Sequence, residues 1–223
     1  MFRSILFAAF AVPFLTAQAP TDPVPALQAE VPTFANATCP IMGKKVSMPL
    51  FVDTELGRFY VCCKPCYKKI LANVPAAHQT AYPVVQEVKN AVCPVSGEPI
   101  GADAVVVTLQ GYRFSVCCEA CVAQARQHSQ VTLVKITRPT TQDVGNTTCP
   151  VTGAAVAANA FVRIGDAVVH LSAPAAVEAA TKDPAGMLAK ARAIAATQPP
   201  KQKHVHGKAD KKPTPGEKPE AGK

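Results

Sequence analysis

The sequence has no tryptophan and only nine phenylalanines and four tyrosines among 223 residues. It has 21 prolines, which interrupt helices and strands. So few bulky aromatic side chains and so many prolines argue against one large hydrophobic core. We therefore expect several small units in a row.

Long apolar runs are also missing, except in residues 5–15. This run follows Arg3 and precedes Ala17-Gln18-Ala19, which predicts a secretory signal over residues 1–19 and a linker over residues 20–35. The run is too short for a comfortable membrane span. Cleavage after Ala19 would leave Pro20 next to the cut, so cleavage after Ala17 and an uncleaved anchor are alternatives. We expect an exported protein, periplasmic or secreted, that is membrane-anchored if the signal stays.

Acidic residues are outnumbered, and the net charge is +8. Half of this excess lies in residues 198–223, where seven lysines face three acidic side chains. This segment is rich in proline and poor in aliphatic residues, so we expect it to be disordered. It predicts a solubilising tail or weak contact with anionic surfaces. Aromatic residues do not alternate with the basic ones, which argues against nucleic acid as a partner.

An N-x-x-C-P-x-x-G signature occurs three times, with its cysteines 54 and then 56 residues apart at Cys39, Cys93 and Cys149. A fixed period of this kind indicates an internal triplication. The predicted repeats span residues 36–89, 90–145 and 146–197.

Each signature is followed by two strand-like runs around a glycine-containing turn and then by a helical pattern. The expected hairpins span residues 50–62, 104–117 and 161–171, and the expected helices span 63–73, 118–128 and 173–182. Second helices are predicted around residues 81–89 and 185–196. The fold class is therefore α+β, with three small tandem modules.

Four cysteines share the same layout in each of the first two repeats, with one in the turn and three where the hairpin meets the helix. Thiolates bind Zn²⁺, Cu(I) and related soft metals, and a helix N-terminus favours their negative charge. The candidate ligands are Cys39, Cys62, Cys63 and Cys66 in the first repeat, and Cys93, Cys117, Cys118 and Cys121 in the second.

The third repeat keeps only Cys149. Alignment on its hairpin places Leu171, Ser172 and Ala175 at the positions of Cys117, Cys118 and Cys121. One thiol cannot close a soft-metal site, so this repeat is interpreted as a packing partner or cap. His170 beside Cys149 is a weaker two-ligand hypothesis, whereas His78 and His128 are expected to be ordinary surface residues.

The Cys-Pro-x-x-Gly turn, the hairpin and the Tyr-x-Cys-Cys-x-x-Cys helix start resemble the TRASH and YHS domains. This resemblance implies treble-clef-like modules that take part in heavy-metal sensing, trafficking or resistance. It assigns ligand roles to Cys39, Cys62 and Cys66 and to Cys93, Cys117 and Cys121, with Cys63 and Cys118 as additional, fourth ligands.

The three cysteines where each hairpin meets its helix are called a triplet here: Cys62, Cys63 and Cys66 form the first, and Cys117, Cys118 and Cys121 form the second. The charges around the two triplets differ. Lys64, Lys68 and Lys69 flank the first triplet, whereas Glu119 lies inside the second. Because cations favour thiolates and anions oppose them, we expect more acidic thiols in the first triplet.

The sequence leaves three functions open. The favoured one is non-enzymatic capture, buffering or delivery of copper, zinc or a heavy metal, with a protein of the cell envelope as a possible partner. Oxidation could instead pair Cys39 or Cys93 with its own triplet, or structural zinc could hold an interaction module. Cys63-Lys64-Pro65-Cys66 also has the form of a thiol oxidoreductase motif, but Glu119-Ala120 replaces the central pair in the second repeat and no βαβ pattern surrounds either motif.

Overall fold

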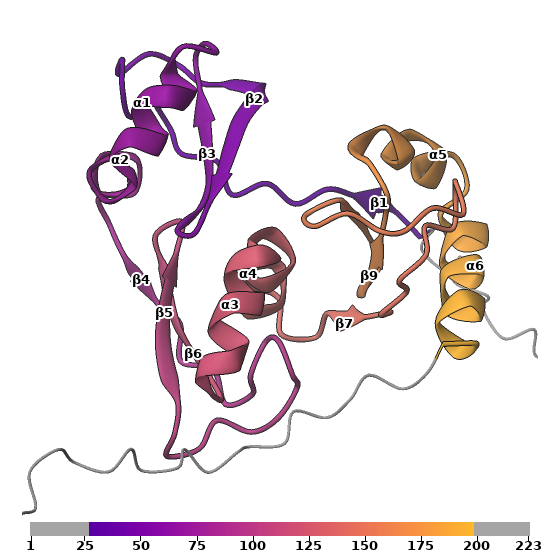
Figure 1. The fold of residues 1–223 in the computed structure, drawn as a ribbon. Coiled ribbons are helices and arrows are strands. Elements are labelled where there is room, and N and C mark those ends of the chain that lie inside the picture. The colour runs from indigo at the N-terminus through magenta and orange to yellow at the C-terminus, as the bar shows by residue number, and fades with distance from the viewer. Residues whose placement is uncertain (1–26, 199–223) are drawn as a thin grey trace, which may run out of the picture.

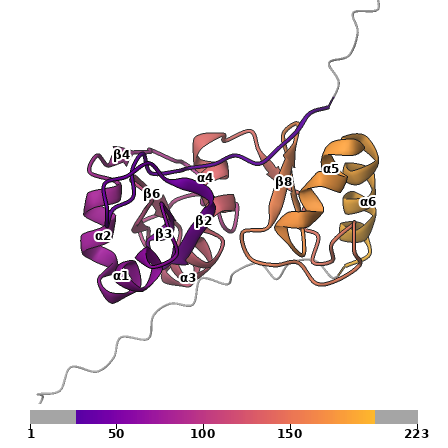
Figure 2. The ribbon, with the colours of Figure 1, turned by 90° about the horizontal axis from the view of Figure 1, so that it is seen from above.

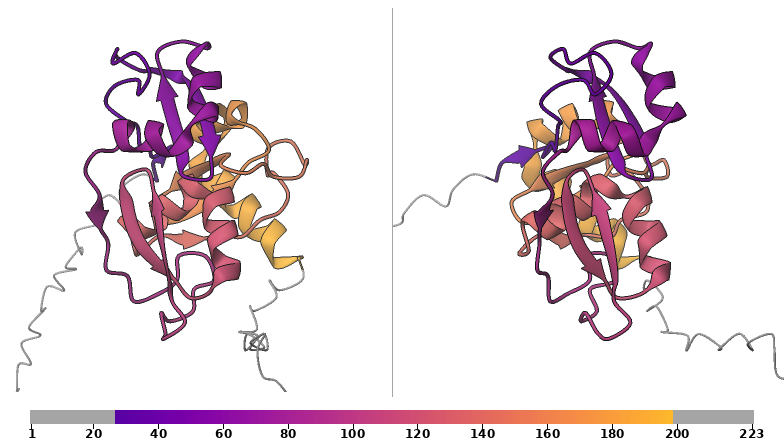
Figure 3. Two further views of the ribbon diagram at one scale, coloured as in Figure 1. Left: turned by 60° about the vertical axis from the view of Figure 1, so that its left-hand side comes forward. Right: turned by 90° about the vertical axis from the view of Figure 1, so that its left-hand side faces the viewer.

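The computed structural model describes residues 27–198, so the expected signal segment and all but the first residue of the expected tail lie outside the described residues. Six α-helices, one short 3-10 helix and three small sheets form a mixed α+β fold in this part of the chain. The three repeats occupy three separate regions in Figure 1, and the first lies against the second in both views of Figure 3. Within residues 27–198 there is no helix with the length and apolar character to cross a membrane.

Each repeat forms an antiparallel β-hairpin where the sequence predicts one. The pairs are β2 (Ser47–Thr54) with β3 (Gly57–Val61), β5 (Val105–Leu109) with β6 (Tyr112–Val116), and β8 (Phe161–Ile164) with β9 (Ala167–His170). The second hairpin turns at Gln110 and Gly111, which both have positive φ values, 47° and 77°. Two such residues make the tight turn whose twist matches that of the flanking strands.

Helices follow each hairpin. They are α1 (Cys66–Ala72) and α2 (Val74–Ala81) in the first repeat, α3 (Glu119–Gln127) and α4 (Ser129–Thr137) in the second, and the 3-10 turn η1 (Pro174–Ala176), α5 (Val177–Lys182) and α6 (Pro184–Ala196) in the third. The expected helix at 185–196 is confirmed by α6. The expected helix at 81–89 is wrong, because α2 starts directly after α1, and α4 was not predicted at all.

Asn73 explains why the second helix of the first repeat starts at Val74 and not near residue 81. Its backbone N–H donates to the carbonyl of Ile70 at the end of α1, and its Oδ1 accepts from the N–H of Ala76 at 3.1 Å in the first turn of α2. Asn73 therefore ends one helix and caps the next. Pro75 sits in the first turn of α2, where a missing N–H costs nothing, so this proline starts a helix and does not terminate one.

The segments between repeats join the sheet of the repeat that follows. β4 (Gln86–Glu87) pairs in parallel with β6, and β7 (Gln142–Asp143) pairs in parallel with β9. β1 (Ala29–Glu30), which precedes the first repeat, pairs instead with β8 in the third. Figure 2 shows this N-terminal segment passing from the third repeat back to the first. The three repeats are thus tied together by backbone pairing.

Each repeat has its own hydrophobic cluster. The central side chains are Phe59 and Ile70 in the first, Phe114 and Leu133 in the second, and Leu171 with its neighbours in the third. A smaller cluster joins α4 to the third hairpin through Val134, Phe161 and Val168. The composition-based prediction of several small cores is therefore confirmed for the described residues.

The buried side chain of Gln110 connects the first two repeats. Its Nε2 donates to the carbonyl of Phe34 at 2.7 Å, its Oε1 accepts from Gln130 Nε2, and its backbone N–H donates to the carbonyl of Leu56 at 3.1 Å. Gln110 is 2% exposed, so water cannot replace these partners. The side-chain amide therefore connects the N-terminal segment to α4, and the backbone N–H of Gln110 adds the first hairpin.

Replacing Gln110 with glycine is expected to lower the free energy of unfolding by about 2 kcal/mol, because the Phe34 carbonyl and the Gln130 amide lose a buried partner. Glycine also accepts the positive φ of this turn, so the loss would report the side chain and not backbone strain. Chemical denaturation of the reduced, metal-free protein measures it. An unchanged unfolding midpoint would show that this contact does not hold the repeats together.

Candidate metal sites

The three Cys-Pro-x-x-Gly segments form the same turn. In the first, the Cys39 carbonyl accepts the N–H of Gly43 and the Cys39 N–H donates to Lys44, both at 2.8 Å. Cys93 makes the same pair of bonds with Gly97 and Glu98. The glycine has positive φ in all three turns, including the one at Cys149. This turn presents the cysteine side chain toward the end of the hairpin.

The asparagine of each signature fixes that turn to the second strand of the hairpin. Asn36 Nδ2 donates to the carbonyls of Thr38 and Tyr60, and its Oδ1 accepts from the N–H of Tyr60 at 2.8 Å. Asn90 makes the equivalent bonds to Ser115, and Asn146 makes them to His170. The N-x-x-C-P-x-x-G signature contains these asparagines, but their positioning role was not predicted from it. Their recurrence at the same spacing in all three repeats is the pattern that could have indicated this role.

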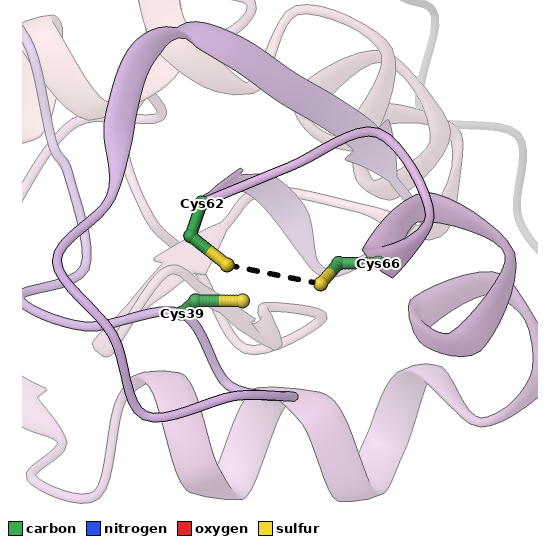
Figure 4. Close-up of side chains that lie close together, drawn as sticks. All are labelled: Cys39, Cys62 and Cys66. Carbon is green, nitrogen blue, oxygen red and sulfur yellow. Dashed lines mark hydrogen bonds between the residues drawn. The ribbon is translucent and has the colours of Figure 1, made fainter.

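The first thiol group brings together Cys39 from the turn, Cys62 from the end of β3 and Cys66 from the start of α1 (Figure 4). Their Sγ atoms all lie within 4.8 Å of one another. Cys63 is adjacent, with its Sγ 3.7 Å from Cys62 and 3.5 Å from Cys66. The structure therefore groups three of the four predicted cysteines, and Cys63 lies next to two of them.

The second thiol group repeats the arrangement with Cys93, Cys117 and Cys121, whose Sγ atoms also lie within 4.8 Å of one another. The Sγ of Cys118 lies 3.8 Å from Cys117 and 3.7 Å from Cys121. One difference is that Cys117 is buried, whereas its counterpart Cys62 is half-buried. The first site is therefore more open to solvent than the second.

These spacings suit a metal bound by cysteine sulfurs. Four thiolates at about 2.3 Å from a tetrahedral zinc ion lie about 3.8 Å from one another. The Sγ–Sγ distances within the triplets run from 3.5 to 4.0 Å. All nine cysteines lie in the described part of the chain and are free thiols. The three sulfurs of each triplet therefore already lie close to the tetrahedral spacing.

The turn cysteines are the more acidic members of each group. Burial raises the pKa of Cys39, but backbone N–H groups of Cys62, Ile41 and Met42 outweigh it and bring the pKa to about 7. Burial likewise raises the pKa of Cys93. The Ser96 hydroxyl and the backbone N–H groups of Ser96, Cys117 and Val95 outweigh this effect and bring the pKa to about 7. Each site thus contains one thiol that is partly ionised at neutral pH, ready to bind a metal.

The pKa shifts of the cysteines near the helix starts run in both directions. Burial, together with the neighbouring thiols, raises the pKa of Cys66 to about 12 and raises that of Cys62. In the second triplet, backbone N–H groups outweigh burial and lower the pKa of Cys118. The pKa values of Cys117 and Cys121 are also raised, so the prediction that lysines make the first triplet more acidic stays a prediction.

The third repeat corrects the sequence alignment by one residue. Asn146 binds His170 where Asn36 binds Tyr60, and the N–H of Ala176 donates to Ala173 as that of Cys66 donates to Cys63. The residues at the three triplet positions are therefore Ser172, Ala173 and Ala176, and not Leu171, Ser172 and Ala175. All three thiols are still absent from this repeat, and the hydroxyl of Ser172 occupies the place of the Cys117 thiol.

His170 does not join Cys149 in a metal group of the described residues. Its Nε2 lies 2.8 Å from Asp143 Oδ1, beside a cavity of about 520 Å³ between the second and third repeats. Burial raises the pKa of Cys149, and the hydroxyls of Ser172 and Thr152 help to bring it to about 7. The two-ligand hypothesis therefore has no support in this geometry.

His78 is not the surface residue that the sequence predicts. It is 9% exposed on α2, packs against Phe59 and Tyr82, and its Nε2 has no hydrogen-bond partner. Burial lowers its pKa, which favours the neutral ring. This histidine belongs to the core of the first repeat.

No family model, curated protein or solved structure matches this chain. The resemblance to TRASH and YHS domains therefore stays a prediction. The structure supports a coarser statement, that two groups of cysteines lie near enough to hold a metal ion.

Metal affinity at the first site is expected to fall steeply with acid. The raised pKa values of Cys62 and Cys66 keep both thiols protonated at neutral pH, so a metal must displace at least two protons there. Each displaced proton weakens the apparent affinity about tenfold per pH unit on acidification, which gives about a hundredfold for two. Competition with a chelator at several pH values measures this slope. An affinity independent of pH between 6 and 8 would contradict ligation by these thiols.

Proposed function

We propose that this chain captures, buffers or delivers a soft metal ion, copper(I) or zinc, through two four-cysteine sites and without catalysing a reaction. The observation that carries this proposal is the convergence of three thiols within 4.8 Å, with a fourth beside them, in two separate repeats. Sulfur-only sites of this kind select soft metals.

The partial exposure of the ligands favours exchange over permanent structural binding. Cys62, Cys63 and Cys118 are half-buried, whereas Cys39, Cys66 and Cys93 are buried. A metal at such a site is bound by buried thiols on one side and is accessible from solvent on the side of the half-buried thiols. An incoming thiol of an acceptor could therefore attack it and accept it by ligand exchange.

The finer architecture is part of this proposal. We infer that each metal-binding repeat is a treble-clef-like module in which a turn, a hairpin and a helix each contribute to the ligand set, as the resemblance to TRASH and YHS domains implies. The third repeat serves as a packing partner, which its shared cluster with α4 supports. We also propose export, with metal capture taking place in the cell envelope or outside the cell.

Elemental analysis of anaerobically purified protein tests the function. The expected result is two equivalents of soft metal per chain, copper or zinc, with exchange by an external thiol within the time of the experiment. Intact mass under non-reducing conditions is measured on the same sample. Protein that carries no metal and has lost two protons for each pair of cysteines would instead establish the disulfide alternative. Tightly held zinc that neither exchanges nor yields to copper(I) would establish the structural-zinc alternative.

A further inference from the structure

One position in the Cys-Pro-x-x-Gly turn differs in chemistry among the three repeats. It is the residue just before the positive-φ glycine, which is Met42 in the first repeat, Ser96 in the second and Thr152 in the third. The same two backbone hydrogen bonds close all three turns. The three side chains therefore start from equivalent places and can be compared directly.

In the second and third repeats the side chain at this position contacts the residue that follows the hairpin. Ser96 Oγ lies 3.3 Å from Cys117 Sγ. Thr152 Oγ1 lies 2.9 Å from the hydroxyl of Ser172, the residue that occupies the place of Cys117. Two of the three repeats thus place this side chain against the residue that follows the hairpin, which is Cys117 in the second repeat and Ser172 in the third. In the first repeat, that position is the half-buried Cys62, and the residue at the equivalent turn position is Met42.

The two kinds of side chain act differently on a metal. A methionine thioether is a soft, neutral donor that binds copper(I), whereas zinc sites in proteins use cysteine, histidine and carboxylate ligands. A serine hydroxyl offers no soft donor, and its hydrogen bond to a thiolate reduces the charge available to the metal. The thioether therefore favours copper(I), and the hydroxyl does not.

The exposure of Met42 fits a ligand role better than a packing role. Of the three methionines that the structure describes, Met187 is buried in the third repeat, whereas Met42 is 50% exposed. Met48, also in the first repeat, is 45% exposed but lies on β2 and outside the turn. The first site is also the more open of the two, because Cys62 is less buried than Cys117.

We propose that this turn position sets metal preference, so that the first repeat is the copper(I) site with Met42 as a supplementary thioether ligand, and the second repeat, with Ser96, has the lower preference for copper(I) over zinc. This inference rests on the proposed metal-binding function and adds that the two sites differ in their preference for copper(I) over zinc. Ser96 acts as a positioning residue through its hydrogen bond to Cys117, whereas Met42 contacts the metal.

The test compares affinities for copper(I) and zinc, each measured by chelator competition, in chains with one intact site. The C93S/C121S chain keeps the first site, and the C39S/C66S chain keeps the second. Met42→Leu in the first chain is expected to weaken copper(I) binding about tenfold and to change zinc binding less than about twofold. Ser96→Met in the second chain is expected to strengthen copper(I) binding, again without a matching change for zinc.

Met48→Leu is the matched control, because it removes an equally exposed thioether from the same repeat but from outside the turn. It is expected to leave both affinities unchanged. If the double-cysteine chains do not fold, the chain with all its cysteines and with Met42→Leu or Ser96→Met alone is loaded with one equivalent of copper(I), and in a parallel sample with one equivalent of zinc. The site that each metal occupies is then read by the protection of its cysteines from alkylation.

The outcomes separate the two proposals. A wild-type chain that binds neither metal would overturn the proposed function. A wild-type chain that binds both metals, with copper(I) affinity unaffected by Met42→Leu, would overturn only the selectivity inference. An equal loss with Met48→Leu would do the same, because position in the turn would then not matter.

Discussion

Replacing Cys66 with serine is expected to abolish metal binding at the first site and to leave the second site fully loaded. Cys66 Sγ lies within 4.8 Å of Cys39 and Cys62 and 3.5 Å from Cys63, so it contacts the whole ligand set. A serine hydroxyl is a poor ligand for a soft metal. The affinity of the first site should fall by more than about a hundredfold, and the metal content of the reduced protein should drop from two equivalents to one.

The same substitution should remove the stabilisation that metal gives to the first repeat. In the wild type, free metal at about a thousand times the dissociation constant raises the free energy of unfolding by about 4 kcal/mol. Cys149→Ser is the control, since Cys149 belongs to neither metal group. Full metal content in Cys66→Ser, or a loss of metal in Cys149→Ser, would show that the proposed ligand set is wrong.

Replacing Asn36 with alanine is expected to lower both stability and metal affinity. The substitution removes four hydrogen bonds, one of them from the Tyr82 hydroxyl, and leaves the buried N–H and carbonyl of Tyr60 without their partner. The cost should be about 3 kcal/mol in the free energy of unfolding. Because Asn36 ties the Cys39 turn to the strand that ends just before Cys62, the affinity of the first site should also fall about tenfold to a hundredfold.

Asn146→Ala provides the matched comparison. Asn146 makes the same three backbone hydrogen bonds in the third repeat and is equally buried, with 2% exposed, but its repeat has no metal group. It should cost a similar free energy of unfolding and leave metal binding unchanged. Denaturation and chelator competition on both variants separate the two effects. If Asn36→Ala left the metal affinity of the first site intact, the asparagine would be structural only.

The sequence was sufficient for the hairpins and for the cysteine groups, because both depend on local patterns. Glycine at the turns and β-branched residues beside them set each hairpin, so β5 and β6 lie within one residue of their predicted bounds. The recurring Cys-Pro-x-x-Gly turn and the cysteines at the helix start implied that distant thiols would meet. The structure brings them within metal-binding distance in both repeats.

Features that depend on contacts between distant residues were not predictable in this way. The apolar Leu171 was aligned with a cysteine, and only the bond from Asn146 to His170 shows the correct register of the third repeat. The pKa values depend on which N–H groups point at each sulfur, which residue charges do not reveal. The two-residue strands β4 and β7 carry too short a pattern to be recognised, although they connect the repeats.

The pairing of β1 with β8 has a consequence for how the protein is made. A ribosome releases Ala29 and Glu30 long before Arg163 and Ile164, their partners in the last sheet. This strand therefore lacks its partner until the third repeat has been synthesised, and only then can the pairing between the beginning of the described chain and its last module form.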